Sequence, residues 1–488
     1  AIELAAARMK LLTPAQIADR LHDRFRLLRS RTGDPRRQTL LAAIEWSFEQ
    51  LDLAERTVLQ RLCVFRSGAT LEAAEAVLAT EGGGDGPAVE AWEVLDLLEQ
   101  LVDKSMVVVD ESPGRGVAGE TRYRLLESIR QYGLESLARE RDPEGVQDAM
   151  LAWCARFMAK AEPQLVGPDQ ADWFARLDQE QGNLRGALEF MFEKLTPERV
   201  ERGRLIGAGA WRFWLACGRV AEGRRLLVRL DKASEGGEPT AAWARVREGI
   251  GAIATATGDL VHAVAYGRAG LDLARHNGDE RTIAGLLACL GAACLGDGIP
   301  SRAHDYFEES LQIRRTMGDR ALTSASLCGL GLCALEMGEL ERADSLLRDA
   351  EQTLRSAGGG LQVAEVHTAF ARLAISRGDA GEAARRLGLA SGLRLSVDAM
   401  TGVPWLLDLY ACVASIRGDH EKALRLFAAS GKGRERLAVP RRPAETVVCE
   451  RFERSASEAV PADRRAVLEN EGRQLPLRRA LRYAKGEA

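Results

Sequence analysis

A chain of 488 residues is too long for one hydrophobic core, so its length predicts two to four domains. The formal net charge is −4 and the charged residues are interspersed, which excludes the overall signature of a polyanion-binding protein. Because the sequence holds no signal peptide and no apolar run of about 18 residues, we expect a cytoplasmic protein. The nine cysteines show no CxxC spacing and predict buried free thiols, with no metal site.

Residues 1–35 carry helical periodicity from the first position onward. Ala1 is not an initiator Met, so we expect further sequence to precede it. Thr13 and Pro14 predict the start of a second helix, because a threonine side chain accepts orphan amide hydrogen bonds and proline suits the first helical position. The segment 30–35 then reads as a loop.

Residues 36–141 show the order of elements that is typical of a winged-helix domain. The glycine- and proline-rich stretch 110–120 would form the wing between two short strands. Residues 142–201 return to helical periodicity and predict a connector to the next region. The predicted elements of the winged-helix domain are helices over 38–51, 54–65, 71–78 and 89–103, strands over 106–109 and 121–125, and a helix over 127–140.

The helix over 89–103 is the one that would enter a DNA groove, since winged-helix proteins often read DNA with such a helix. DNA affinity comes largely from cations that neutralise phosphates, and this helix is acidic, so DNA would repel it. We therefore expect a signal-transmitting winged helix and no specific DNA contact from this chain, with a DNA-binding transcription factor as an alternative. The charged residues concerned are Glu90, Glu93, Asp96, Glu99 and Asp103, against the single Lys104.

Residues 202–436 repeat themselves with a period of 40 residues. Glycine or alanine stands five residues after each repeated glycine, and a small residue stands seven before it in five of the six units. A second set of turns lies halfway between, at 277–279, 317–319 and 358–360. The pattern predicts six helix-turn-helix units. The repeated glycines are Gly218, Gly258, Gly298, Gly338, Gly378 and Gly418.

The small residues have a packing role, because they let the two helices of a unit approach closely. Large apolar residues such as Leu290, Phe307 and Leu347 would fill the layers between units, which must stack to bury both faces. This pattern resembles the tetratricopeptide repeat, whose usual period is about 34 residues. We therefore predict an all-α protein in which a winged-helix domain is followed by a right-handed tetratricopeptide-like α-superhelix. Pro440 and Pro443 interrupt the periodicity and leave residues 437–488 as a helical tail.

The first helices of the units predict a binding surface, because superhelical stacking leaves a concave face open to solvent. Inward-facing positions that need not pack lie thirteen, ten, six and two residues before each turn glycine. Mixed charge together with a tryptophan suits a peptide segment or a small polar effector better than a polyanion. The predicted partner-binding residues are Arg212, Arg245, Glu248, Glu336, Glu365, Arg372, Trp405 and Asp408.

Five stretches of the sequence carry a family resemblance that extends over essentially the whole chain. Together they resemble bacterial STAND-type signalling ATPases, in which an NB-ARC-like nucleotide switch precedes a winged helix and tetratricopeptide repeats. Family members usually read Gly-Leu-Pro-Leu just before a segment such as 1–5, so the resemblance implies that residues 1–35 end the helical subdomain of a nucleotide-binding module. The stretches are RQTLLAAIEWS at 37–47, VF at 64–65, TLEAAEAV at 70–77, LVDKS at 101–105 and YRLLESIRQY at 123–132.

The phosphate-binding loop that ATP hydrolysis needs is missing, since no GxxxxGK[ST] occurs. The nearest similar run, 430–433, is predicted to be a turn. We therefore expect no enzyme activity, no catalytic or metal site and no cofactor in this chain, with ATP or ADP bound by the upstream module. The resemblance implies the regulatory part of a transcriptional or signalling regulator, in which a protein partner or small effector on the repeats shifts the nucleotide-held domain arrangement. A constitutive interaction scaffold is the alternative.

Overall fold

The computed structural model describes residues 40–79, 87–110, 120–140, 142–355 and 360–487. This described part is all-α apart from one two-stranded antiparallel hairpin, as the sequence predicts. The predicted helices of residues 1–35 and most of the predicted wing lie outside the described residues. The chain divides into two compact units, of which unit 1 takes the residues up to Arg156 together with Asp178–Lys194 and unit 2 takes the rest. The predicted domain boundaries at 141, 201 and 436 stay predictions.

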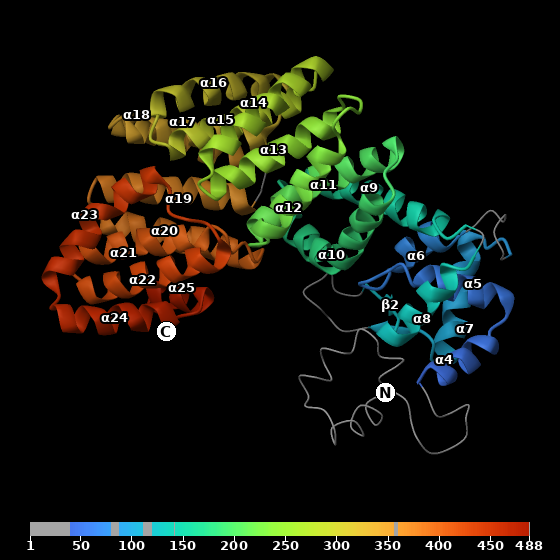
Figure 1. Ribbon diagram of the computed structural model, residues 1–488. Helices are drawn as coiled ribbons and strands as arrows, with labels where there is room; N and C mark the ends of the chain where they lie inside the picture. The colour runs from blue at the N-terminus through green and yellow to red at the C-terminus, as the bar shows by residue number, and fades with distance from the viewer. Residues whose placement is uncertain (1–39, 80–86, 111–119, 141, 356–359, 488) are drawn as a thin grey trace. The chain divides into compact units, whose positions relative to one another are not determined.

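Unit 1 consists of short helices around the hairpin (Figure 1). Val109 of the first strand pairs with Tyr123 of the second, and Tyr123 also forms a bridge to Ala69. Helices α9 (Gly145–Gln164) and α10 (Gln170–Glu193) contribute residues to both units. The other elements of unit 1 are α4 (Leu40–Glu49), α5 (Leu53–Leu62), α6 (Leu71–Leu78), the 3-10 helix η3 (Ala91–Glu93), α7 (Val94–Asp103), β1 (Val108–Asp110), β2 (Arg122–Arg124) and α8 (Glu127–Leu137).

A buried polar cluster fixes the second strand of the hairpin within unit 1. Arg122 donates to Glu180 at 2.7 Å, and both side chains are buried. Asn183, which is fully buried, donates to the Gly68 carbonyl at 2.9 Å. Because the buried Arg122 and Glu180 charges pair with each other, these contacts hold β2 against α10 without an unpaired charge.

Unit 2 contains the repeat array, in which each of the six helix-turn-helix repeats is a pair of antiparallel helices (Figure 1). From here on, the first to sixth units are these repeats, whereas unit 1 and unit 2 are the two compact parts of the chain. The first helices are α11 (Pro197–Ala216), α13 (Ala241–Ala256), α15 (Glu280–Gly296), α17 (Arg320–Glu336), α19 (Gly360–Ser376) and α21 (Val403–Ile416). The second helices are α12 (Val220–Ala233), α14 (Leu260–Asn277), α16 (Pro300–Thr316), α18 (Leu340–Leu354), α20 (Ala380–Ser396) and α22 (His420–Leu437). The tail forms α23 (Pro443–Ala459), α24 (Ala462–Gln474) and α25 (Leu477–Lys485).

The turn glycines have the backbone conformation that the period predicts. All six have φ between 71° and 80°, a left-handed region that glycine adopts without steric cost. Aspartates that directly follow turn glycines then accept amide hydrogen bonds at the start of the next helix. These capping residues are Asp259, Asp279, Asp319, Asp379 and Asp419.

The small residues lie at close helix crossings, which confirms the register of the repeats. A methyl group at Gly291 would lie 3.0 Å from the Phe307 ring, and one at Gly331 would lie 2.9 Å from Leu347. Ala343, five residues after its turn glycine, is fully buried. These positions therefore tolerate no added bulk without movement of the neighbouring helix.

The first helices form a continuous layer, because each contacts the first helix of the next unit from α11 through α21. Hydrogen bonds within unit 2 also join parts of the chain that are distant in sequence. The Leu361 amide donates to Gln170, 191 positions away, at 2.9 Å, and the Thr401 amide donates to the Ala216 carbonyl at 3.2 Å. The sixth unit thus contacts the first as well as the fifth.

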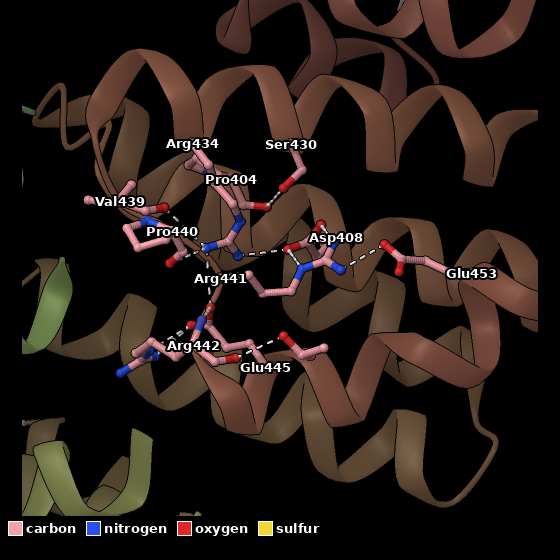
Figure 2. A network of polar contacts seen from close by, with 11 residues as sticks. Pro404, Asp408, Ser430, Arg434, Val439, Pro440, Arg441, Arg442, Glu445 and Glu453 are labelled. Carbon is pink, nitrogen blue, oxygen red and sulfur yellow. Dashed lines mark hydrogen bonds and ion pairs between the residues drawn. The ribbon is translucent and has the colours of Figure 1, made fainter. Parts of the chain in front are cut away.

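One local expectation is wrong. The run 430–433 is not a turn but lies inside α22, where Ser430 is fully buried and donates to the Pro404 carbonyl at 2.9 Å (Figure 2). Two glycines in this run did not end the helix, because packing against α21 outweighs their low helix propensity. None of the described helices has both the length and the apolar character of a membrane span.

Candidate binding face of the repeat array

The layer of first helices is the candidate binding face, and all eight predicted partner-binding residues lie on it. Arg212 is on α11, and Arg245 and Glu248 are on α13. The remaining five are Glu336 on α17, Glu365 and Arg372 on α19, and Trp405 and Asp408 on α21. Whether they bind a partner stays a prediction. What the structure adds is that they pair with one another and with residues from outside the first helices.

Two ion pairs join predicted residues of successive units. Arg212 donates to Glu248 at 3.2 Å, and Arg372 donates to Glu336. The Arg372 guanidinium also lies 5.9 Å from the centre of the Trp405 ring, within cation–π range. Five of the eight residues therefore form two groups, each of which spans neighbouring units.

Arg245 and Glu365 pair with residues that lie outside the first helices. Arg245 donates at 2.6 Å to Glu162 of α9, which precedes the array. Glu365 accepts a hydrogen bond from Arg394 of α20, although the Glu365 side chain is 60% exposed. Each of these charges is therefore already compensated within unit 2.

Asp408 corrects the expectation that all eight residues face solvent, because its side chain is 0% exposed. Arg434 of α22 donates to it at 2.7 Å, and Arg441 of the tail donates to it at 2.8 Å (Figure 2). The tail after the sixth unit covers this position, which the spacing within the array could not reveal. Asp408 cannot touch a ligand while these arginines remain in place.

The network around Asp408 continues into α23 through Glu445 (Figure 2). Glu445 pairs with Arg434 at 3.2 Å and with Arg442 at 2.6 Å. Burial alone would disfavour the ionised form of Glu445, but Arg442 and Arg434 outweigh burial and hold its pKa below the usual range. Arg441 also donates to Glu453 at 2.7 Å. The network therefore joins the sixth unit to the tail by charge-assisted hydrogen bonds.

The pKa of Glu248 is shifted in the opposite direction from that of Glu445. It is 4% exposed, and burial raises the pKa of its carboxyl, an effect that Arg212 only partly offsets. Gly285 of α15 leaves the room that this side chain occupies, since a methyl group there would lie 2.5 Å from Glu248 Oε1. The carboxylate therefore lies in the layer of first helices rather than on its surface.

Sequence reasoning missed a set of largely buried arginines on the second helices. Arg314, Arg394 and Arg434 each lie sixteen residues after a turn glycine, in the third, fifth and sixth units. Arg314 and Arg394 are buried, and the Arg434 side chain is 10% exposed. Each points toward the first-helix layer, where it donates to residues of that layer. The recurrence of arginine at one register position was the available signal, but only first-helix positions were considered as candidates for the binding face.

The chemistry of this face is that of paired charges. Among the described residues, no three His, Cys, Asp or Glu side chains gather as metal ligands would. Most of the nine cysteines are buried, and burial raises the pKa of Cys289, Cys328 and Cys333 to about 12, so their thiols stay protonated at neutral pH. The eight predicted residues thus offer guanidinium groups, carboxylates and one tryptophan.

Comparison with known proteins gives relatives in sequence and in fold. No protein-family model matches the chain. A Mycobacterium tuberculosis protein named "putative HTH-type transcriptional regulator" is 33% identical over 366 residues, which cover 66% of this chain and 40% of the relative. An uncharacterized protein of the same species is 44% identical over 154 residues, which cover 31% of this chain and 36% of the relative. The matches therefore span less than half of either relative.

Among solved structures, a Rap protein complexed with competence and sporulation factor matches with a TM-score of 0.50. The match covers 74% of this chain and 92% of the Rap chain at 13% identity. A likeness at this level of identity shows the fold alone. The array therefore has the tetratricopeptide-like α-superhelical fold that its period predicts.

Proposed function

We propose that this chain is the regulatory, partner-sensing part of a larger STAND-type transcriptional regulator, in which the repeat array binds a protein segment or a small effector. The observation that carries the proposal is the continuous layer of first helices, whose arginines and carboxylates pair across successive units. A ligand that exchanges with these partners would change how neighbouring units pack. Such differential binding is what shifts a two-state equilibrium.

The name of the Mycobacterium tuberculosis relative supports a role in transcription, and its greater length leaves room for the further domains of such a regulator. In this proposal the chain neither hydrolyses ATP nor binds it tightly, because it has no loop that cradles phosphates. The nucleotide would bind to an upstream module, and residues 36–141 would form the winged helix that responds to its state.

We also propose that this chain makes no specific DNA contact of its own. Asp96, Glu99 and Asp103 are exposed on α7, the helix that would enter the major groove in a winged-helix DNA complex. A mobility shift that discriminates between DNA sequences at about 150 mM salt would contradict this part of the proposal.

The main test replaces Arg372 and Trp405 together by alanine in the full-length regulator, in a strain that lacks the native gene. We expect the double variant to fail to restore the regulated transcripts while its helical content in circular dichroism stays unchanged. Arg342→Ala is the matched control, because it removes an arginine from the exposed second helix α18, where Arg342 pairs only with nearby surface groups. Full restoration by the double variant would show that this face is not the sensor.

A second measurement separates the switch from a constitutive scaffold. If the regulator is a nucleotide switch, replacing the lysine of the upstream phosphate-binding loop should lock its transcriptional output in one state. If the natural upstream sequence contains no such loop, or if its lysine can be replaced without effect, the scaffold alternative holds.

A further inference from the structure

The three arginines at this register position do not have the same partners. In the fifth unit Arg394 pairs with Glu365, which lies thirteen residues before the turn glycine. In the sixth unit Arg434 pairs with Asp408, ten residues before the turn glycine. The third unit holds no acid at these two positions, which are occupied by Gly285 and Ala288.

Arg314 of the third unit is accordingly a buried cation without a carboxylate of its own. It is 4% exposed, and one guanidinium nitrogen donates at 2.8 Å to both the Leu322 carbonyl and the Ser326 hydroxyl. Its Nε has no hydrogen-bond partner, which is equally true of Arg394 and Arg434, but within the described part of the chain no carboxylate lies at ion-pair distance from Arg314. Burial lowers the pKa of Arg314 to about 10, so the group remains charged at neutral pH.

No group around Arg314 forms an ion pair with it. Glu248 and Asp319 both act on it electrostatically, but the Glu248 carboxylate is bonded to Arg212, and Asp319 accepts the Leu322 amide at the start of α17. The adjacent Arg245 is bonded to Glu162. We call Arg314, Glu248, Arg212, Arg245 and Glu162 the unit-3 cluster, after the third repeat, which carries Arg314. The two glutamates of the cluster pair with Arg212 and Arg245, which leaves Arg314 as its one member without an ion pair. Buried charges in proteins are normally paired, so the cluster lacks one anionic group.

Two arginines of the cluster are partly exposed on the first-helix layer. The Arg212 and Arg245 side chains are 20% and 22% exposed, and they flank the more deeply buried Glu248. Ala288 and Cys289 beside them are only half-buried. Trp211, over whose ring the Arg212 guanidinium lies at 4.1 Å, keeps a buried indole N–H without a partner in the described structure. The site thus offers unused donors together with a cation that has no ion pair.

We propose that the unit-3 cluster binds a carboxylate group of an incoming ligand, which pairs with Arg314 as Glu365 and Asp408 pair with the equivalent arginines. This inference rests on the proposed function, since it names the chemical group by which the repeats recognise an effector. An acidic side chain of a peptide and a small organic acid carry the same group. Arg212 and Arg245 are the more exposed arginines of the cluster, and Arg314 provides the charge that the ligand neutralises.

The test uses the full chain of 488 residues and two pairs of probes at about 150 mM salt. One pair is an amidated, acetylated hexaglutamate and the matching hexaglutamine, and the other is succinate and succinamide. We expect calorimetry to detect binding of at least one carboxylate probe and of neither amide. Binding of hexaglutamate alone identifies a peptide ligand, and binding of succinate identifies a small acid.

Two substitutions should change this binding in opposite directions. Arg314→Met removes the cation without an ion pair and should weaken binding about tenfold or more, as loss of a charge-assisted contact predicts. Glu248→Gln leaves a second arginine without an ion pair and should tighten binding several-fold. Arg342→Met on the exposed face of α18 is the control and should change nothing. The opposite signs keep the test decisive even if Arg314→Met does not fold.

The proposal is overturned if no carboxylate probe binds, if Arg314→Met binds as the wild type does, or if Glu248→Gln weakens binding. Its failure can be told from failure of the proposed function. Arg372 and Trp405 belong to the fifth and sixth units, so their double variant leaves the unit-3 cluster intact and reports on the sensor face alone.

Discussion

The third and sixth units each carry an arginine at the same position of their second helix, but only the arginine of the sixth unit forms ion pairs. In the sixth unit Arg434 pairs with the fully buried Asp408 and with Glu445 of the tail, and Asp408 also accepts from Arg441, so every charge has a partner. In the third unit Arg314 meets backbone and hydroxyl oxygens only. A buried arginine thus serves internal structure where an acid accompanies it, and remains available to a ligand where none does.

The largest effect should come from breaking the closed network of the sixth unit. Asp408→Ala leaves Arg434 and Arg441 without their shared buried partner and should lower the free energy of unfolding by about 3–5 kcal/mol. Urea denaturation of the full chain measures this. Glu341→Ala is the control, since this side chain is 91% exposed and its distant pair with Arg377 should be worth about 1 kcal/mol at most. Equal effects of the two substitutions would show that the network does not hold the sixth unit.

A smaller loss should follow from Ala343→Leu, which tests the register on which the comparison of units depends. Ala343 is fully buried at the close crossing of the fourth unit, so the added side chain should overpack the helix pair by about 1–3 kcal/mol. Arg342→Leu, at the exposed neighbouring position, is the control. A melting temperature unchanged by Ala343→Leu would mean that the units are aligned wrongly.

The sequence could predict this register because it depends on local requirements that recur. A left-handed turn needs glycine, as at Gly338, and a close crossing needs a small residue, as at Ala343. The candidate site was less accessible to such reasoning. Asp408 was expected to face solvent, but Arg441 from beyond the last unit covers it. Arg314 was overlooked because its guanidinium reaches the first-helix layer from a second helix.

An aspartate at the position in the third unit that is equivalent to Asp408 should give Arg314 an ion-pair partner like that of Arg434. Ala288 occupies the position equivalent to Asp408, so Ala288→Asp should pair with Arg314 and stabilise the protein by about 1.5 kcal/mol, as a hydrogen bond to a charged group does. The same variant should no longer bind the carboxylate probes. Ala288→Asn has nearly the same shape without the charge and should do neither. If Ala288→Asp destabilises the chain and leaves probe binding intact, the two positions are not equivalent.

The smallest effect should appear in the pH dependence of stability, because Glu445 and Glu248 contribute with opposite signs. Arg442 and Arg434 outweigh the effect of burial and hold the pKa of Glu445 below its ordinary value near 4.5, so its contribution is present above that value and is lost as the pH falls through the lower folded pKa. Burial raises the pKa of Glu248, so its contribution is present below about 4.5 and is lost as the pH rises through the higher folded pKa.

Lowering the pH from 7 should therefore reduce the loss of unfolding free energy that Glu445→Gln causes. The same change of pH should raise the unfolding free energy of wild type relative to that of Glu248→Gln. Unfolding free energies at several pH values between 7 and 4 would show the two differences moving in opposite directions. A common direction would mean that the unit-3 cluster, to which Glu248 belongs, compensates its charges as the sixth unit does.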